Sequence, residues 1–180
     1  MILYILVIAA LLPIAIGWTG RFRIVCALAA SILLGAAVVV RATADIDVDR
    51  GVLGIFAAVL AVAGGSIVAT SVFDVVDETS KEPPAESIEA AGEILRGGTW
   101  IGALERLAIF GSLVVGIPSG VALTLAVKGL GRYPELRSGK RPATAERFII
   151  GTLVSVLWAA FCAYVASGFL PLDLGDTVTG

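Results

Sequence analysis

Five long apolar runs constrain the fold of this chain more than any other feature of its sequence. The hydrocarbon core of a bilayer is about 30 Å thick, and about 20 residues of α-helix cross it. Each run is continuously apolar, without the alternation of a membrane barrel strand, and a backbone in lipid must satisfy its own hydrogen bonds. We therefore predict an all-α membrane bundle, a single domain over residues 1–180. The five predicted spans cover residues 2–18, 24–40, 51–73, 104–127 and 148–168.

The composition also excludes several classes of protein. Hydrophobic residues make up 58% of the chain and charged residues 16%, whereas soluble domains are about 45–50% apolar and about 25% charged. Histidine is absent, which removes the most common general base and metal ligand. Cys26 and Cys162 lie inside apolar runs without a CxxC neighbour, so we expect buried thiols. The sequence predicts no metal and no cofactor.

The longest polar segment, residues 74–100, separates the third and fourth runs. Seven of its residues are acidic, against Lys81 and Arg96. Its second half, Pro84–Arg96, has apolar residues at helical spacing, prolines that can open a helix, and Gly97–Gly98 that can end it. We expect a short amphipathic helix on the membrane surface or against the bundle, with a solvated acidic face.

Lysine and arginine in short loops predict the orientation, because cytoplasmic loops carry the excess. With five spans and the amino terminus inside, the inner loops hold eight of these residues and the outer segments four. We therefore predict an N-in, C-out protein of the cytoplasmic membrane. The first run lacks a basic n-region and a small-residue cleavage site, so we expect a retained span. Arginine outnumbers lysine ten to three, which points to a bacterial source.

Small residues recur at intervals of three or four in the last three runs, a pattern that lets helices approach closely in lipid. Pro118 interrupts the fourth run and predicts a bend there, which is either a packing feature or a hinge. We expect these three runs to form a tightly packed core. The stripes comprise Gly51, Gly54, Ala58, Ala61, Gly65 and Ala69 in the third run, Ser112, Gly116, Gly120 and Thr124 in the fourth, and Gly151, Ser155, Ala159, Cys162 and Ala166 in the fifth.

Glu105 and Arg106 are the most informative charged residues, since they stand where the fourth run enters the membrane. Ionisable residues near a span usually face the bundle and pair with another group, and they mark candidate functional sites. Arg106 could pair with Glu105, with Asp74 or with an anionic ligand. In the simpler interpretation, both residues reach the headgroups beside Trp100 and set the depth of the helix.

A basic loop joins the fourth and fifth runs. It favours the cytoplasmic side, and it could also attract anionic lipid. No nucleic-acid-binding module is recognisable in the sequence, so we expect no nucleic-acid partner. The basic residues of this loop are Lys128, Arg132, Arg137, Lys140, Arg141 and Arg147.

Residues 98–166 resemble the carboxyl-terminal half of small uncharacterised bacterial membrane proteins. The resemblance rests on Ile-Gly-Ala-Leu-Glu-Arg at 101–106, Ala-Val-Lys-Gly-Leu-Gly-Arg at 126–132 and Glu-Arg-Phe-Ile-Ile-Gly-Thr-Leu-Val-Ser at 146–155. Gly129 departs from the family pattern, which tends to have serine after the lysine. The resemblance brings no activity with it, but it implies a set of motif positions. These are Glu105, Arg106, Lys128, Arg132, Glu146 and Arg147.

Three functional hypotheses follow. The first is a non-catalytic structural, accessory or interaction component of a bacterial membrane, contacting lipids and, as a homo-oligomer or otherwise, other membrane subunits. The second is a small oligomeric transporter or channel whose polar path uses Glu105, Arg106, Ser112, Thr124 and the bend at Pro118. The third is a membrane enzyme that acts on a lipid-linked substrate, with Arg106 and the basic loop holding a phosphate. We favour the first, because catalytic residue sets are missing from the sequence.

Overall fold

The structure is a computed structural model of the chain, and it describes residues 1–18, 20, 22–44, 48–79, 88–137 and 142–168. Side chains are described within these ranges except at 77–98 and 134–145. The regular structure of the described residues is entirely helical, which confirms the all-α prediction. The six helices are α1 (Ile2–Gly17), α2 (Arg23–Thr43), α3 (Arg50–Thr79), α4 (Ile88–Val114), α5 (Ser119–Arg137) and α6 (Pro142–Ser167).

Three of these helices are long and apolar enough to cross a membrane. The apolar stretches are Arg23–Thr43 in α2, Arg50–Val76 in α3 and Glu146–Ser167 in α6, and α1 is a shorter apolar helix. The 16 residues of α1 extend about 24 Å at the helical rise of about 1.5 Å per residue. The helical lengths and composition are therefore compatible with a membrane protein.

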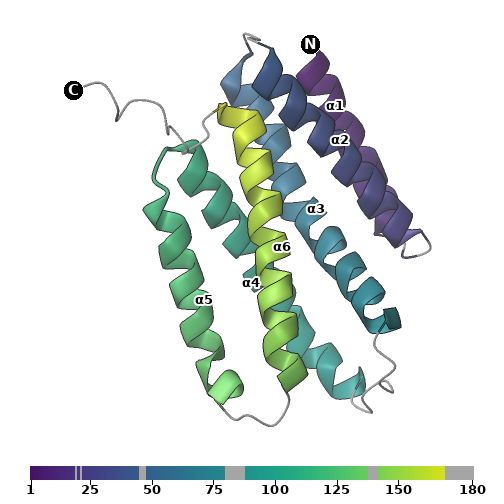
Figure 1. Cartoon of the computed structure of the whole chain (residues 1–180), viewed down its shortest axis with the longest axis vertical. Helices are drawn as coiled ribbons and strands as arrows, with labels where there is room; N and C mark the ends of the chain where they lie inside the picture. Colours follow the sequence, from purple (N-terminus) through teal and green to yellow (C-terminus); the bar gives the residue numbers. More distant parts are fainter. Residues whose placement is uncertain (19, 21, 45–47, 80–87, 138–141, 169–180) are drawn as a thin grey trace.

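The helices form an elongated bundle with α3 and α6 at its centre (Figure 1). The antiparallel pair α1 and α2 packs against α3, while α4 packs against both α3 and α6. Helix α5 lies at the outer side of α4 and has its main backbone contacts with α4. We call the end of the bundle that holds Met1 and the last turn of α6 the upper end. The opposite end, where α4 and α6 begin and α5 ends, is the lower end, and the shorter α1–α2 pair stops above it.

The predicted span 104–127 is wrong as a single bent helix, because α4 ends at Val114 and α5 begins at Ser119. The backbone N–H of Gly116 donates to the Leu113 carbonyl oxygen at 3.1 Å, and that of Ile117 donates to the Ser112 carbonyl oxygen at 2.8 Å. These two hydrogen bonds form a Schellman motif, and Gly116 supplies its left-handed residue with a φ of 78°. The chain therefore reverses at 115–118, and α4 and α5 form a hairpin.

The predicted amphipathic surface helix is also corrected in part. Residues 88–96 belong to α4, which continues through Gly97 and Gly98 into the bundle. The i→i−4 hydrogen bonds of a long helix can carry it across a glycine pair at a cost of about 1 kcal/mol per glycine. The first part of the predicted helix, residues 84–87, lies outside the described residues.

Glycines allow α3 and α6 to pack closely. A Cβ atom on Gly64 would lie 2.5 Å from Cζ2 of Trp158, and one on Gly151 would lie 2.7 Å from Cζ of Phe73. The indole N–H of Trp158 donates a hydrogen bond to the Leu60 carbonyl oxygen at 2.9 Å. Aromatic rings thus occupy the space that a side chain would need on the facing helix, as expected for small-residue packing in lipid.

The small-residue stripe of the fifth run matches the packed face of α6. Ser155, Ala159, Cys162 and Ala166 are all buried there. In the third run the predicted stripe extends beyond the part of α3 that packs closely against a neighbour. A Cβ atom on Gly54 would meet no neighbouring atom within 4 Å. Spacing alone cannot tell where along a helix its neighbour begins to touch it.

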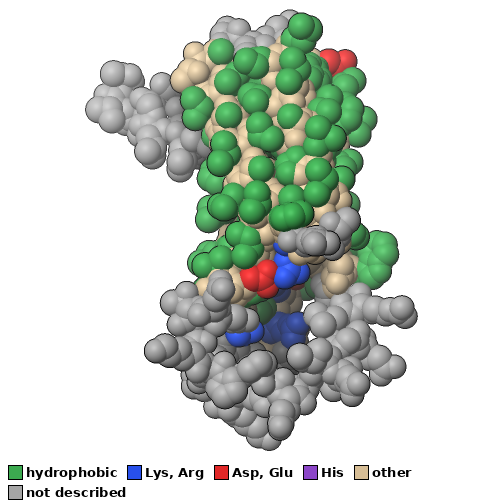
Figure 2. Space-filling view, turned by 90° about the vertical axis from the view of Figure 1, so that its right-hand side faces the viewer, with side chains coloured by type: hydrophobic (Ala, Val, Ile, Leu, Met, Phe, Trp, Pro, Cys, Tyr) green, Lys and Arg blue, Asp and Glu red, His purple; other side chains and the backbone are tan. Residues whose placement is uncertain are grey.

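The outer surface of the bundle is mostly apolar. Figure 2 shows hydrophobic side chains covering the upper part of one face, with charged side chains gathered below them. Among the described residues, Ile32 of α2 and Leu130 of α5 are 71% and 73% exposed. Large exposed apolar areas are rare on soluble monomers, so this surface is suited to lipid.

Candidate functional site

The candidate site lies on α4 inside the bundle and is built around Arg106. Its side chain is 4% exposed and crosses from α4 to α3. The guanidinium Nε donates to the Val62 carbonyl oxygen at 3.0 Å, and Nη2 donates to the Ser66 hydroxyl at 2.6 Å. Gly65 makes room for this crossing, since a Cβ atom there would lie 2.9 Å from the Arg106 Nε. Arg106 therefore points into the bundle. The simpler interpretation, in which its side chain reaches the headgroups, does not match this position.

The depth of Arg106 follows from its partner on α3. Val62 lies midway along α3 between Arg50 at the upper end and Asp74 near the lower end. The helical rise places it about 18 Å from each. Arg106 thus binds α3 near the middle of the apolar height of the bundle, and it does so through a backbone carbonyl and a hydroxyl.

Glu105 forms an ion pair with Lys128 of α5. Both side chains are mostly buried, at 12% and 20% exposure. The Lys128 ammonium also lies 5.9 Å from the ring centre of Phe148 on α6, within cation–π range. Adjacent residues of a helix point about 100° apart, so Glu105 contacts α5 while Arg106 contacts α3.

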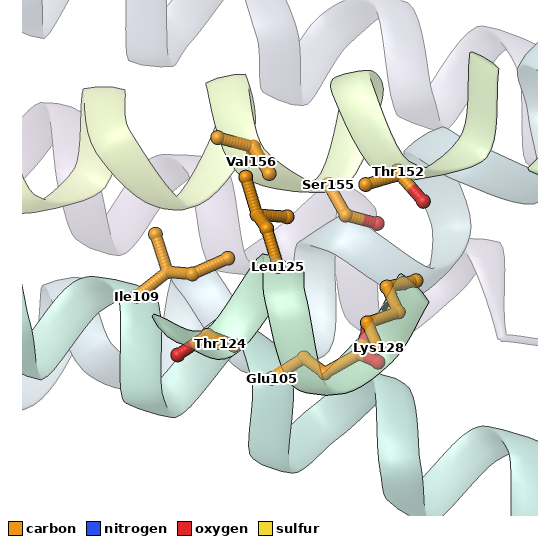
Figure 3. Close-up of a pocket in the computed structure, with 8 residues that line it drawn as sticks. All are labelled: Glu105, Ile109, Thr124, Leu125, Lys128, Thr152, Ser155 and Val156. Atoms are coloured by element: carbon orange, nitrogen blue, oxygen red, sulfur yellow. Dashed lines mark hydrogen bonds and ion pairs between the residues drawn. The ribbon is translucent and has the colours of Figure 1, made fainter. Parts of the chain in front are cut away.

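Two hydroxyl residues of α6 lie beside this ion pair. Figure 3 shows Thr152 and Ser155 of α6 and Thr124 of α5 beside Glu105 and Lys128, with Ile109, Leu125 and Val156 completing the cluster. The space between these eight side chains does not accommodate a water molecule. The Thr124 hydroxyl donates to the Gly120 carbonyl oxygen at 2.8 Å. The Thr152 hydroxyl is buried and has no hydrogen-bond partner among the described residues.

Asp74, another predicted partner of Arg106, pairs elsewhere. Arg23 of α2 donates to Oδ2 of Asp74 from Nε at 3.0 Å and from Nη2 at 2.5 Å. Both side chains are 37% exposed, and the pair joins the start of α2 to α3 near the lower end. Such an exposed pair contributes about 0–1 kcal/mol, so it fixes the position of the helix ends more than it stabilises them.

The basic loop is spread along α5 and α6 rather than gathered at one site. Lys128 lies within the bundle, while Arg132 and Arg147 are exposed toward the lower end. The side chains of Arg137, Lys140 and Arg141 lie outside the described residues. The described structure therefore brings together Glu105 and Lys128 of the motif positions, and it turns Arg106 toward α3 on another face of α4.

The predicted hinge residues form the α4–α5 hairpin. Ser112 and Gly120 face each other across it, because a Cβ atom on Gly120 would overlap the Ser112 side chain. Pro118 directly precedes α5, where its fixed φ suits a helix start. An open cavity of about 390 Å³ lies at this tip, lined by residues from the start of α3, the α4–α5 turn and the end of α6. The lining residues are Arg50, Val114, Val115, Gly116, Ser167 and Gly168.

Sequence reasoning missed several residues of the site. Ser66 and Thr152 are single hydroxyls in apolar runs, and in membrane helices such groups commonly bond to neighbouring helices. That signal could have marked them as candidates, although not their partners. Among the described residues, no three cysteine or carboxylate side chains are grouped so as to hold a metal. Comparison with models of protein families, with curated proteins and with solved structures finds no match.

Proposed function

We propose that this chain is an integral protein of a bacterial cytoplasmic membrane, with a non-catalytic structural or accessory role. Its apolar surface would contact lipids, further copies of the chain or another membrane subunit. The observation that carries this proposal is that the charged side chains midway along the bundle bind groups on neighbouring helices. Arg106 binds α3, and Glu105 binds Lys128, so these charges hold helices together. A transport site would instead keep them open to water or to a ligand.

We infer a revised orientation from the alternating directions of the six described helices. The loops at the lower end join α1 to α2, α3 to α4 and α5 to α6. Of the thirteen lysine and arginine residues, nine lie in or beside these loops, and Arg106 and Lys128 lie within the bundle. Arg41 and Arg50 are at the upper end. The positive-inside rule then favours a cytoplasmic lower end, with both termini outside.

One observation favours the transporter as a second candidate. The unpartnered Thr152 hydroxyl lies beside the Glu105–Lys128 pair, and polar groups inside a membrane bundle often mark a pathway. The residues named for that path, however, do not share one channel. Ser112 and Gly120 are in contact at the hairpin, and the space beside Glu105 is too narrow for a water molecule.

Ion flux into liposomes tests the two candidates. Purified protein is reconstituted and the entry of protons, sodium, potassium and chloride is followed with fluorescent indicators. We expect the same leak as in protein-free liposomes, because the mid-depth charges are bound within the chain. A flux that Glu105→Ala or Arg106→Ala abolishes, while the variant protein still elutes as the wild type does, would establish the transporter instead.

A further inference from the structure

Helix α5 covers a polar surface of the bundle, although it has few contacts beyond those with α4. Helix α5 has its main backbone contacts with α4, and its outer face is exposed at Leu123, Val127 and Leu130. The inner face carries Thr124 and Lys128 toward α6. A helix held mainly by one neighbour belongs to the less stable part of a fold. Moving α5 would therefore break few contacts with the rest of the bundle.

Lys128 is the residue that ties α5 to both of its neighbours. Its ammonium pairs with Glu105 of α4 and lies over the ring of Phe148 of α6. Both charged side chains are mostly buried, where a polar contact meets less competition from water. Breaking this side-chain contact would therefore weaken the hold of α5 on α6, where Leu125 also packs, and the turn at Val115–Pro118 would remain as the connection at the upper end.

The closed position leaves one buried group unsatisfied. The Thr152 hydroxyl faces this cluster without a hydrogen-bond partner, and an unpaired buried hydroxyl is unfavourable. If α5 moved away, water could reach Thr152, Ser155 and Glu105 together. The same side chains that are closely packed in the described structure would then line a polar cleft between α4 and α6.

We propose that α5 is a movable flap, hinged at the α4–α5 turn and latched by Lys128, which opens a polar cleft lined by Glu105, Thr152 and Ser155. The inference does not depend on the accessory role proposed above. It concerns whether this face of α6 becomes accessible, and a protein that carries no ion flux can still open the flap.

The accessibility of a thiol on α6 tests the flap. Ser155→Cys places the thiol in the cluster with little change of size, and the protein is treated with N-ethylmaleimide in detergent micelles and in membranes. We expect slow labelling with Lys128 intact. Labelling should become about three- to fifteenfold faster with Lys128→Met, the range that one interhelical polar contact in a membrane sustains. The native Cys162, which is fully buried in the core, is the control within the same molecule.

Mass spectrometry assigns the label to each cysteine and separates the outcomes. Faster labelling of the cysteine at 155 with Cys162 unlabelled supports the flap. A charge exchange, Glu105→Lys with Lys128→Glu, should return the labelling to its slow rate. The proposal is overturned if Lys128→Met leaves the rate at 155 unchanged, or if Cys162 is labelled to the same extent, since that would mean general loosening of the bundle.

Discussion

At the scale of single residues, the bundle uses its mid-depth charges as connections between helices. Burying an arginine is costly unless its donors are bound. Arg106 meets this requirement on α3 with a carbonyl and a hydroxyl. The planar guanidinium presents several N–H groups in fixed directions, which is why it can contact two residues one turn apart. Lysine could not reproduce this geometry with a single ammonium.

Removing the Arg106 side chain should weaken the bundle. We expect Arg106→Ala to lower the free energy of unfolding by about 1–3 kcal/mol, because two interhelical hydrogen bonds of about 0.6–1.7 kcal/mol each are lost. Unfolding by SDS in mixed micelles, followed by tryptophan fluorescence, measures the change. Arg50→Ala is the control, since a substitution at that exposed position should change stability by no more than about 0.5 kcal/mol. A more stable Arg106→Ala protein would show that burial of the charge costs more than its hydrogen bonds return.

Glu105 and Arg106 could be identified from the sequence as members of a site, because charges are rare in an apolar run. Their partners could not. Arg106 binds a backbone carbonyl and Ser66, and any helix offers a carbonyl at every residue. Lys128 was assigned to a cytoplasmic loop, yet it pairs with Glu105 because the hairpin brings α5 back along α4.

At the scale of elements, the interpretation of Pro118 decided how much of the fold was predicted correctly. The sequence Gly-Ile-Pro at 116–118 contains a glycine that can adopt a left-handed φ, followed two residues later by a proline, which is a helix-stop signal. The apolar run continues through it, so hydropathy indicated one bent helix. The left-handed glycine and the proline end the helix. Hydropathy does not detect this end, because a bent helix and a helical hairpin can be equally apolar.

The hairpin turn should depend on Gly116. We expect Gly116→Ala to lower the free energy of unfolding by about 1–2 kcal/mol, since a residue with a Cβ atom is strained at positive φ. The SDS titration described above measures it. Gly111→Ala is the matched control, because a Cβ atom there meets nothing within 4 Å and alanine is the better helix former. Equal effects of the two substitutions would argue against the Schellman turn.

The crossing of α3 and α6 should be equally specific. We expect Gly64→Ala to destabilise the protein by about 1–3 kcal/mol, because the added methyl would meet the Trp158 ring, which is held by its hydrogen bond to Leu60. Gly54→Ala on the same helix should be neutral or stabilising, as a Cβ atom there has open space. Thermal unfolding of the two variants side by side measures the difference. If both behaved alike, close contact at Gly64 would not be what holds α3 against α6.

At the scale of the whole molecule, one turn changes the end of the bundle at which the connecting loops lie. A single span over 104–127 would put the 41–50 and 128–147 loops on the same side. The hairpin at 115–118 puts them at opposite ends, and the loops rich in arginine and lysine then share the lower end. The charge distribution, divided between sides in the five-span prediction, becomes strongly one-sided, as expected for a membrane protein of fixed orientation.

Labelling of single cysteines from one side of the membrane tests both the number of crossings and the orientation. Thr43→Cys lies at the upper end and Tyr133→Cys toward the lower end, and both side chains are exposed, whereas the native Cys26 and Cys162 are buried. In intact cells we expect an impermeant maleimide to label only Thr43→Cys, with Tyr133→Cys reacting after permeabilisation. The reverse pattern would keep the six-helix path and invert the orientation. If both sites reacted from the same side, the chain would cross an even number of times between them, and the hairpin itself would be refuted.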